Sequence, residues 1–526
     1  MSDTLTGLLV ALLCVAALAA TGLRWLRVAQ REHYIGGRAR RIAGLWLSRS
    51  RADLALATAA AVLALVACVR PLGWGATAAG LAGAALAVVL PRGLGIRGRT
   101  SRLSWTSRLR RLAIAWALLN VALGTLLAWL LGPASLAVLV VGAPLTLDVA
   151  LAVMEVVEKR LSAPFVAQAQ RRLARIRPQV VAVTGSYGKT STKGYIAHLL
   201  SASTAVVASP ASFNNRLGLS RAVNDGLVEG TEVFVAEMGT YGPGEIRELC
   251  TLFPPDVAVI TTIGEAHLER MRTTQTILAA KSEITERART VVLPIDTPEL
   301  AGLADRCRDA GKRVVTVSVR EAAEPAPAVA DADVVVDLAA GTVDVRGPEG
   351  PVTLTVGEGV AHGVNLGVAL GVALAVGADL APVGARLRAL PRAAHRAEVQ
   401  DPGTGLLVVD DTYNANPIGA RAALDEAAAL AQARGGRLVV VTPGIVELGP
   451  VQHVRNADFA RAAADAGAHL VVVGRTNRAA LLEGALAGGA SVDVVDQRSQ
   501  AVPVATSAAG EQGVILYEND LPDHYP

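Results

Sequence analysis

The sequence predicts an α-helical membrane domain followed by an α/β region, in which a P-loop ATPase domain precedes a Rossmann-like, doubly wound domain. Three observations predict this order. Residues 54–147 contain no Asp, Glu or Lys, a glycine-rich loop at residues 185–190 separates a predicted strand from a predicted helix, and strands alternate with helices after residue 391. Hydrophobic residues make up 52% of the 526-residue chain and the mean hydropathy is +0.41, which indicates that part of the chain lies in a bilayer.

Five apolar segments predict transmembrane helices in a domain spanning residues 1–158. They are Thr4–Leu23, Leu54–Val69, Leu72–Leu90, Leu112–Leu131 and Ala134–Met154. Each has a length near the ~20 residues that cross a bilayer. The loops between Arg24 and Arg51 and between Arg92 and Arg111 are rich in arginine, which places them in the cytoplasm. The expected localisation is therefore the inner cell membrane, multi-pass, with cytoplasmic catalytic domains, a basic linker helix at residues 159–178 and membrane lipid as a partner.

Residues 179–200 predict a phosphate-binding loop. A buried strand over Gln179–Thr184 leads into it and a helix follows from Thr190. The loop consists of Gly185, Ser186, Tyr187, Gly188, Lys189 and Thr190, with Ser191 next. In this arrangement backbone N–H groups and the helix dipole face an anion. We expect ATP as the ligand, with Lys189 at its outer phosphates and the Thr190 hydroxyl on Mg²⁺.

Polar side chains follow the loop at the ends of further predicted elements. They belong to Asn214, Asn215, Glu237, His267 and Lys281. Glu237 ends a predicted strand, a position from which a carboxylate can help to hold Mg²⁺. Taken alone, His267 could be a core histidine and Lys281 a surface lysine.

In this order, the segments resemble the central ATPase domain of the Mur ligases. The shared motifs are the GKTS loop, NNxxG, an acid–Met–Gly strand end, AHLE and AKxEI. Within the family, the resemblance is greatest to the type that adds D-alanyl-D-alanine to a muramoyl tripeptide. It covers about Val180 to Gly449 and implies a central ATP-binding domain over residues 179–390 and a C-terminal domain over residues 391–526.

The resemblance implies a two-metal site. Thr190 and Glu237 look like ligands of the Mg²⁺ between the β- and γ-phosphates, and His267 and Lys281 look like the second metal site. The family's lysine at the Lys281 position is carbamylated, which replaces an ammonium that would repel Mg²⁺ with an anionic oxygen ligand. Lys189, His267 and Lys281 are therefore the expected catalytic residues. Asn214 and Asn215 are the expected substrate-binding residues.

The other end of the nucleotide is expected at three residues farther along the chain. Asn365 opens a helix rich in Ala, Gly and Leu, while Arg396 and Asp411 flank the start of the C-terminal domain. All three match family residues that contact the nucleotide.

Between the phosphate loop and Asn365, the alternating pattern of Asp333 to Val356 predicts a β-hairpin appended to the central domain.

Two departures from the family leave the substrates open. Family members have a soluble N-terminal domain that binds a UDP-sugar, where this chain has predicted spans. The segments Thr442–Gly449 and Tyr517–Pro522 also differ from the family's GDM-x-ELG and KGSR-like motifs, which belong to the part that receives the amine.

The implied reaction is ATP-dependent amide formation between a carboxylate-bearing precursor and an amino acid or dipeptide, in cell-wall precursor synthesis. The alternatives are a chain-extending ligase like the membrane-bound polyglutamate synthases and a non-catalytic nucleotide-binding membrane scaffold. A membrane-protein partner could take the place of the missing UDP-binding domain in delivering the substrate, and no nucleic-acid partner is expected. Four cysteines without a CxxC pair argue against a zinc site or a disulfide framework.

Overall fold

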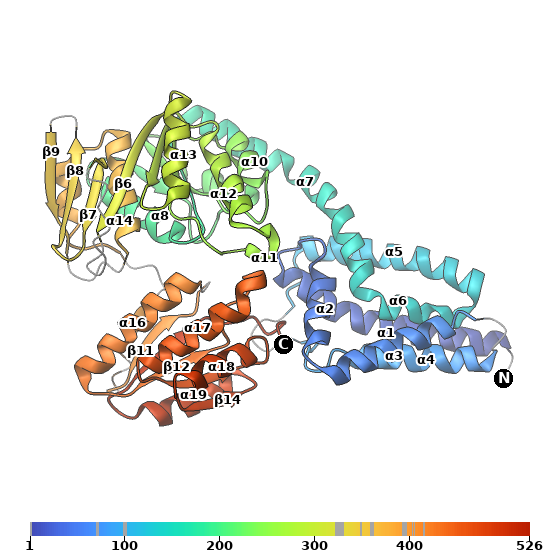
Figure 1. Ribbon diagram of the computed structural model, residues 1–526. Helices are drawn as coiled ribbons and strands as arrows, with labels where there is room; N and C mark the ends of the chain where they lie inside the picture. Colours follow the sequence, from blue (N-terminus) through green and yellow to red (C-terminus); the bar gives the residue numbers. More distant parts are fainter. Residues whose placement is uncertain are drawn as a thin grey trace. The chain divides into compact units, whose positions relative to one another are not determined.

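The computed structural model describes residues 3–69, 73–97, 103–320, 331–347, 350–357, 362–391, 397–401, 403, 405–413 and 416–526. The chain forms two compact units (Figure 1). The helical unit contains Met1–Leu161 together with Gly474–Thr476 and Asp520–Pro526. The α/β unit contains Ser162–Val473 and Asn477–Asn519.

The helical unit packs its helices around two apolar clusters, one that includes Trp25, Ile42 and Leu147 and one that includes Val10 and Ala64. Two of its helices begin at residues whose hydroxyl groups accept a backbone N–H bond, Ser50 before α3 and Thr106 before α5. The helices are α1 (Asp3–Arg31), α2 (Arg38–Ser48), α3 (Arg51–Val66), α4 (Trp74–Val89), α5 (Ser107–Leu131), η2 (Pro133–Leu136), α6 (Ala137–Val141) and the first half of α7 (Ala143–Ile176). The fifth predicted span, Ala134–Met154, is therefore divided between η2, α6 and the start of α7, and α7 continues through most of the predicted basic linker.

Length and composition support two or three of the five predicted transmembrane helices, and the count of five stays a prediction. Among the described residues, α1 and α5 alone are long and apolar enough to cross a membrane, and the bent pair of Pro133–Val141 and Ala143–Ile176, with 71° between its halves, would make a third. The helices α3 and α4 contain 16 residues each. At 1.5 Å per residue they reach about 24 Å, which is short of the ~30 Å hydrocarbon layer. Leu72, where the third predicted span begins, lies outside the described residues.

The central part of the α/β unit is a nine-stranded sheet in the order β2-β3-β1-β4-β5-β6-β7-β8-β9. All neighbouring strands are parallel as far as β7, and the last two pairs are antiparallel. The strands are β1 (Gln179–Thr184), β2 (Val206–Ala208), β3 (Val233–Glu237), β4 (Val257–Ile260), β5 (Thr290–Pro294), β6 (Arg313–Arg320), β7 (Val334–Asp337), β8 (Thr342–Gly347) and β9 (Gly350–Thr355). The predicted hairpin is confirmed, but it continues the main sheet through β7 and is not a separate appendage (Figure 1).

Two apolar layers cover this sheet. One contains side chains of α8 (Lys189–Leu200), α14 (Gly363–Val376) and α15 (Leu380–Arg386). The other contains side chains of the end of α7, α9 (Arg216–Arg221), η3 (Ala222–Gly226), α10 (Glu245–Leu252), η4 (Glu283–Thr285) and α13 (Pro298–Asp309). Helix α14 lies close to the sheet, and only glycine fits at two of its positions. A Cβ atom at Gly367 would lie 2.5 Å from a valine methyl group of β6, and one at Gly371 would lie 2.7 Å from a valine methyl group of β5.

The C-terminal part of the α/β unit is a six-stranded sheet in the order β10-β11-β15-β12-β13-β14, parallel except for the edge strand β10. The strands are β10 (Glu398–Gln400), β11 (Leu407–Asp411), β12 (Leu438–Thr442), β13 (His469–Val473), β14 (Val492–Val495) and β15 (Val514–Glu518). Its helices α16 (Pro417–Arg434), α17 (Gln452–Asp465) and α18 (Arg478–Ala487) supply one apolar cluster, and α19 (Arg498–Ala509) supplies the other. The predicted doubly wound domain is confirmed.

Candidate functional site

The phosphate loop joins the carboxyl end of β1 to the start of α8, where the end of β4 holds its backbone. Ser186 Oγ accepts a bond from Gly264 N at 2.9 Å, and Tyr187 N donates to Thr262 Oγ1 at 3.1 Å. Lys189 Nζ donates to the carbonyl of Gly185 at 2.8 Å. The Lys189 side chain therefore folds back over the loop. An anion bound by the loop would contact its ammonium group.

The backbone of the loop at Gly188 lies close against the side chain of Asn365. Gly188 has a φ of +77°, and a Cβ atom there would lie 2.2 Å from Oδ1 of Asn365. That oxygen accepts a bond from Thr192 Oγ1 at 3.1 Å, and the Asn365 residue is 4% exposed. The structure thus places the predicted adenine-contacting Asn365 directly beneath the loop, with a protein hydroxyl as its partner.

Glu237 is the centre of a buried polar cluster at the end of β3. Its Oε2 accepts bonds from Thr190 Oγ1 and from Lys193 Nζ, each at 3.0 Å, and its Oε1 accepts one from Asn214 Nδ2 at 3.2 Å. The structure therefore brings together three predicted residues, Thr190, Glu237 and Asn214. It adds Lys193, which is 5% exposed and supplies the positive charge that a buried carboxylate requires.

Lys281, near the end of α12 (Thr274–Ser282), is buried at 2% exposure. Its Nζ donates to the carbonyl of Gly185 at 3.0 Å. Burial, followed by the nearby Lys189 ammonium, holds the pKa of Lys281 well below its usual value. A lysine with a lowered pKa presents a neutral amine, which is the form that reacts with CO₂.

His267 is held by residues of both α/β domains. Its Nδ1 lies 2.7 Å from Oε2 of Glu447, whose Oε1 accepts a bond from Arg270 Nη2 at 2.8 Å. The ring of Tyr241 packs edge-on against the imidazole with centroids 5.2 Å apart, and the Arg270 guanidinium lies 4.1 Å from the Tyr241 ring centre. His267 and Glu447 both adopt left-handed backbone conformations, with φ of +60° and +65°. Such conformations cost roughly 1–3 kcal/mol each and concentrate at functional sites.

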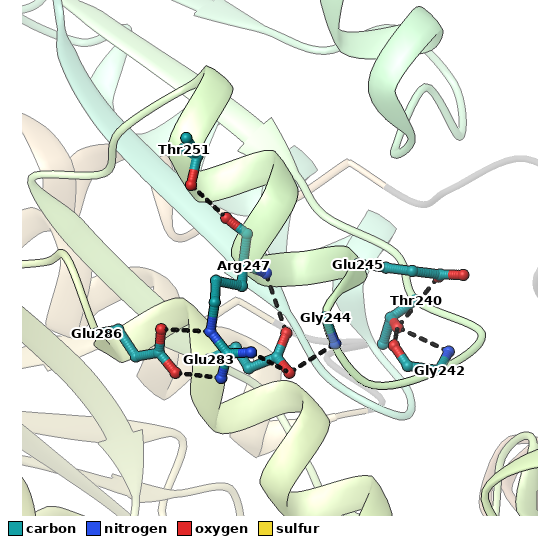
Figure 2. A network of polar contacts seen from close by, with 8 residues as sticks. All are labelled: Thr240, Gly242, Gly244, Glu245, Arg247, Thr251, Glu283 and Glu286. Atoms are coloured by element: carbon teal, nitrogen blue, oxygen red, sulfur yellow. Dashed lines mark hydrogen bonds and ion pairs between the residues drawn. The ribbon is translucent and has the colours of Figure 1, made fainter. Parts of the chain in front are cut away.

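The loop that carries Tyr241 is anchored by Glu283, two residues after Lys281 in the sequence; Figure 2 shows the polar contacts of Glu283 with Gly244 and Arg247. Glu283, 4% exposed, accepts backbone bonds from Gly244 at 2.7 Å and from Arg247 at 3.0 Å. Arg247 in turn makes two bonds to Glu286. On the other side of the loop, Glu245 accepts bonds from the Tyr241 N–H and the Thr240 hydroxyl. Together these bonds hold the loop that carries Tyr241 at a fixed distance from helix α12, which carries Lys281.

These groups line one cavity of about 240 Å³. Its walls include Lys189, Thr190, Glu237, His267, Lys281, Asn214 and Asn215 from the central domain, and Tyr413, Asn416, Glu447 and Asn519 from the C-terminal domain. Asn215 also caps α9 by accepting a bond from Gly218 N at 3.0 Å. A second cavity of about 700 Å³ is bounded by Tyr187, His362, Arg421 and Arg455.

The three predicted contacts to the far end of the nucleotide stay predictions. Asn365 borders neither cavity. Asp411, at the end of β11, accepts a bond from Ala397 N at 3.1 Å and borders neither cavity. Arg396 lies outside the described residues.

The residues present fit a divalent metal at Thr190 and Glu237, because a hydroxyl and a carboxylate, the hard oxygen ligands that Mg²⁺ prefers, meet beside the phosphate loop. In the described part of the chain, no group of three or more His, Cys, Asp and Glu side chains is arranged for a metal. A second metal at His267 and Lys281 would need the lysine to carry an oxygen ligand.

Sequence reasoning missed Glu447, Tyr241, Lys193 and Glu283. Glu447 lies in the Thr442–Gly449 segment that differs from the family motif, and Lys193 lies one helical turn after Lys189. The sequence therefore draws attention to both positions, but it does not show that they contact His267 and Glu237. Tyr241 and Glu283 gain their roles from the fold alone.

Comparison with known proteins places these features in one family. Residues 183–353 match the Mur ligase middle domain and residues 395–517 match the Mur ligase glutamate ligase domain. The chain is 32% identical over 265 residues to the UDP-N-acetylmuramoyl-tripeptide–D-alanyl-D-alanine ligase of Mycobacterium leprae, covering 48% of this chain and 50% of the relative. It therefore spans about half the length of that relative.

Solved structures agree. MurF from Acinetobacter baumannii superposes with a TM-score of 0.55 at 25% identity, over 68% of this chain and 77% of that chain. MurF from Thermotoga maritima in complex with ADP has the same fold, with a TM-score of 0.52 at 22% identity, over 68% of this chain and 80% of that chain.

The predicted localisation, a multi-pass protein of the inner membrane with cytoplasmic catalytic domains, is wrong. The relatives that overturn it are named as UDP-N-acetylmuramoyl-tripeptide–D-alanyl-D-alanine ligases and MurF, and neither their names nor their titles describe a membrane protein. The two family matches begin at residue 183, so they give no support to a membrane role for the helices before it.

Proposed function

The chain belongs to the Mur ligase family, and from that premise we propose that it is an ATP-dependent ligase which forms an amide bond in the synthesis of a peptidoglycan precursor. The observation that carries the proposal is the single cavity that contains Lys189, the Thr190–Glu237 pair, His267 and Lys281. Ligases of this family use ATP and Mg²⁺. A scaffold that only bound a nucleotide would have no chemical need for a buried lysine and a strained histidine at the same place.

We assign the phosphates to the first cavity. The helix N-terminus of α8 and Lys189 would attract the negative charge, and Thr190 and Glu237 would hold Mg²⁺. Mg²⁺ would supply charge neutralisation at the phosphates. The larger cavity on the other side of Tyr187 has the volume for a nucleoside, and His362, Arg421 and Arg455 would border it.

The reaction has two steps. A carboxylate oxygen of the acyl substrate attacks the γ-phosphorus of ATP, the bond to the bridging oxygen breaks, and ADP leaves with the acyl phosphate formed. The amine nitrogen of the second substrate then attacks the acyl carbon, loses a proton, and phosphate leaves. Lys189 balances the charge of the two anions that must meet, and Asn214 and Asn215 orient the carboxylate. For the second step, the His267–Glu447 pair lines the same cavity as Lys189 and Asn214, so we assign it as the candidate acceptor of the amine proton.

The substrates come from the relatives' printed names. We propose a muramoyl-peptide acid as the acyl substrate and an amino acid or dipeptide as the amine, with D-alanyl-D-alanine the first to test. The ATP-binding domain would occupy residues 179–390 and the amine-receiving domain residues 391–526. In the second domain Val446, Glu447, Leu448 and Asn519 are cavity residues in segments that depart from the family motifs, and the polar pair Glu447 and Asn519 are our candidates for amine selection.

The test is incubation of the purified full-length chain with ATP, Mg²⁺ and pairs of candidate acids and amines. ADP release that requires both substrates, with a product mass equal to their sum minus water, supports the proposal. The Lys189→Ala variant should release no ADP. ATP hydrolysis that no acid and amine pair stimulates would overturn it.

A further inference from the structure

The segment Asp520–Pro526 belongs to the helical unit, although it follows directly on the last strand of the α/β unit. Arg27 Nη1 donates to Asp523 Oδ1 at 2.7 Å, and His524 Nε2 lies 2.9 Å from Glu32 Oε1. The indole N–H of Trp46 donates to the His524 carbonyl at 2.8 Å. We call Asp520–Pro526 the strap, and Arg27, Glu32, Arg38 and Trp46 the socket.

The far end of the strap is also held within the helical unit. The carbonyl of Pro526 accepts bonds from Thr476 Oγ1 at 2.7 Å and from Arg475 N at 3.2 Å. The ring of Tyr525 packs against the apolar cluster that includes Trp25 and Trp46. Every part of the strap from Asp523 onward therefore has a specific partner.

The socket is buried and its charge is balanced by the strap. Arg27 is 1% exposed and His524 is 1% exposed. Arg38 pairs with Glu32 at 3.2 Å, so the socket by itself contains two arginines and one carboxylate. Among the described residues Asp523 is the ion-pair partner of Arg27. Because a buried charge without a partner is strongly destabilising, the socket in this conformation requires the strap.

The residue before the strap lies in the candidate active site. Asn519 lines the cavity, has a φ of +61°, and donates through Nδ2 to the Gly444 carbonyl at 2.7 Å. Its backbone N–H donates to the Asp411 carbonyl at 3.0 Å. A displacement of Asp520 must therefore be transmitted through one peptide unit to a residue of the cavity wall.

We propose that the helical unit contains a peptide-binding socket specific for the Asp-His segment of the strap, and that its occupancy holds Asn519 and the Thr442–Gly449 segment in the conformation seen here. The helical unit then controls the amine side of the site through the strap. Only this consequence for activity rests on the proposed function. The binding of the strap in the socket does not.

Hydrogen–deuterium exchange of the full-length chain tests the proposal. Asp523→Asn leaves Arg27 buried without its counter-charge, so amide exchange should quicken at least about tenfold in the strap, in residues 24–46 and in Thr442–Gly449. The matched control is Asp305→Asn, which makes the same change in the exposed pair of Asp305 with Arg308. Its exchange should equal that of the unaltered chain in all three segments.

A double variant separates loss of the strap contact from failure to fold. Arg27→Met combined with Asp523→Asn removes both charges, so it should regain most of the protection of residues 24–46. Helix content from circular dichroism confirms that each variant is folded.

Unchanged exchange of the strap and socket in Asp523→Asn would overturn the socket. Faster exchange confined to the strap and socket, with Thr442–Gly449 unaffected, would overturn the control of the site. If the unaltered chain forms no amide with any substrate pair but shows the expected exchange pattern, the proposed function fails and the socket stands.

Discussion

Nδ1 of His267 and Oε2 of Glu447 lie 2.7 Å apart, although 180 residues separate them in the sequence. The contact joins the central domain to the C-terminal domain at the wall of the candidate active site. Both residues adopt a left-handed backbone conformation that favours glycine. The pair therefore links residues of the two domains, and the carboxylate orients the imidazole.

Replacing Glu447 with Gln should lower kcat by about 10- to 100-fold, because the imidazole loses the carboxylate that sets its orientation. The measurement is ADP release at saturating substrates. The matched control is Glu483→Gln, which alters a His–Glu pair of the same 2.7 Å length whose side chains are 56% and 66% exposed. An unchanged kcat in Glu447→Gln would show that the pair is only structural.

Lys281 should carry a carbamate. Burial lowers the pKa of this lysine and so favours its neutral amine, which reacts with CO₂, and the purified chain in ¹³C-bicarbonate should therefore show a carbamate resonance. Lys281→Ala should abolish both the resonance and ADP release, and a short carboxylate should restore part of the release. Lys159→Ala, which removes an exposed lysine of the helical unit, should retain the resonance and the activity. Full turnover by Lys281→Ala would refute the metal role of this lysine.

Gly188→Ala should weaken nucleotide binding and destabilise the α/β unit. The left-handed backbone costs a side chain about 1–2 kcal/mol, and contact with Asn365 Oδ1 adds about 1–3 kcal/mol. Gly230→Ala is the control, because Gly230 has a similar φ of +85° with no atom within 4 Å of the new Cβ. Calorimetric titration with ADP and thermal unfolding measure the two effects. Equal effects in both variants would exclude the contact as the cause.

Adding Asn365→Ala to Gly188→Ala should recover part of the lost stability, since it removes the atom that the new Cβ meets.

The stability of the α/β unit should fall as the pH rises through the range set by Glu518. Complete burial is the main cause that raises the pKa of this carboxyl group to about 8, from 4.5, and the Asp411 carboxylate also raises it. Because the folded state retains the proton, the contribution of Glu518 is present below pH 4.5 and is lost as the pH approaches about 8. Glu518→Gln should remove this part of the pH dependence in thermal unfolding curves taken from pH 5 to 9. Parallel curves for the two proteins would show that Glu518 is ionised throughout.

The core of the α/β unit could be predicted from the sequence because its strands are short, continuous valine-rich runs with clear ends. β1 coincides with the predicted strand, and Thr190, Glu237 and Lys281 meet in one cavity as the motifs implied. The bond between His267 and Glu447 could not be predicted, since it depends on how two domains close. Hydropathy also failed to show where α3 and α4 end, because helix ends depend on caps such as Ser50.

Helix α14 has its glycines Gly363, Gly367 and Gly371 on the side that faces the sheet, at intervals of one turn. The backbone of the helix therefore packs directly against the side chains of the sheet. This contact sets the distance between Asn365 and the phosphate loop, and a change of side-chain rotamer in the helix cannot alter it. Substitutions on this helix should therefore affect the site from a distance. A methyl group at Gly371, more than a turn and a half from Asn365, would move the helix away from the sheet and loosen the phosphate loop, although no residue that touches a substrate is altered.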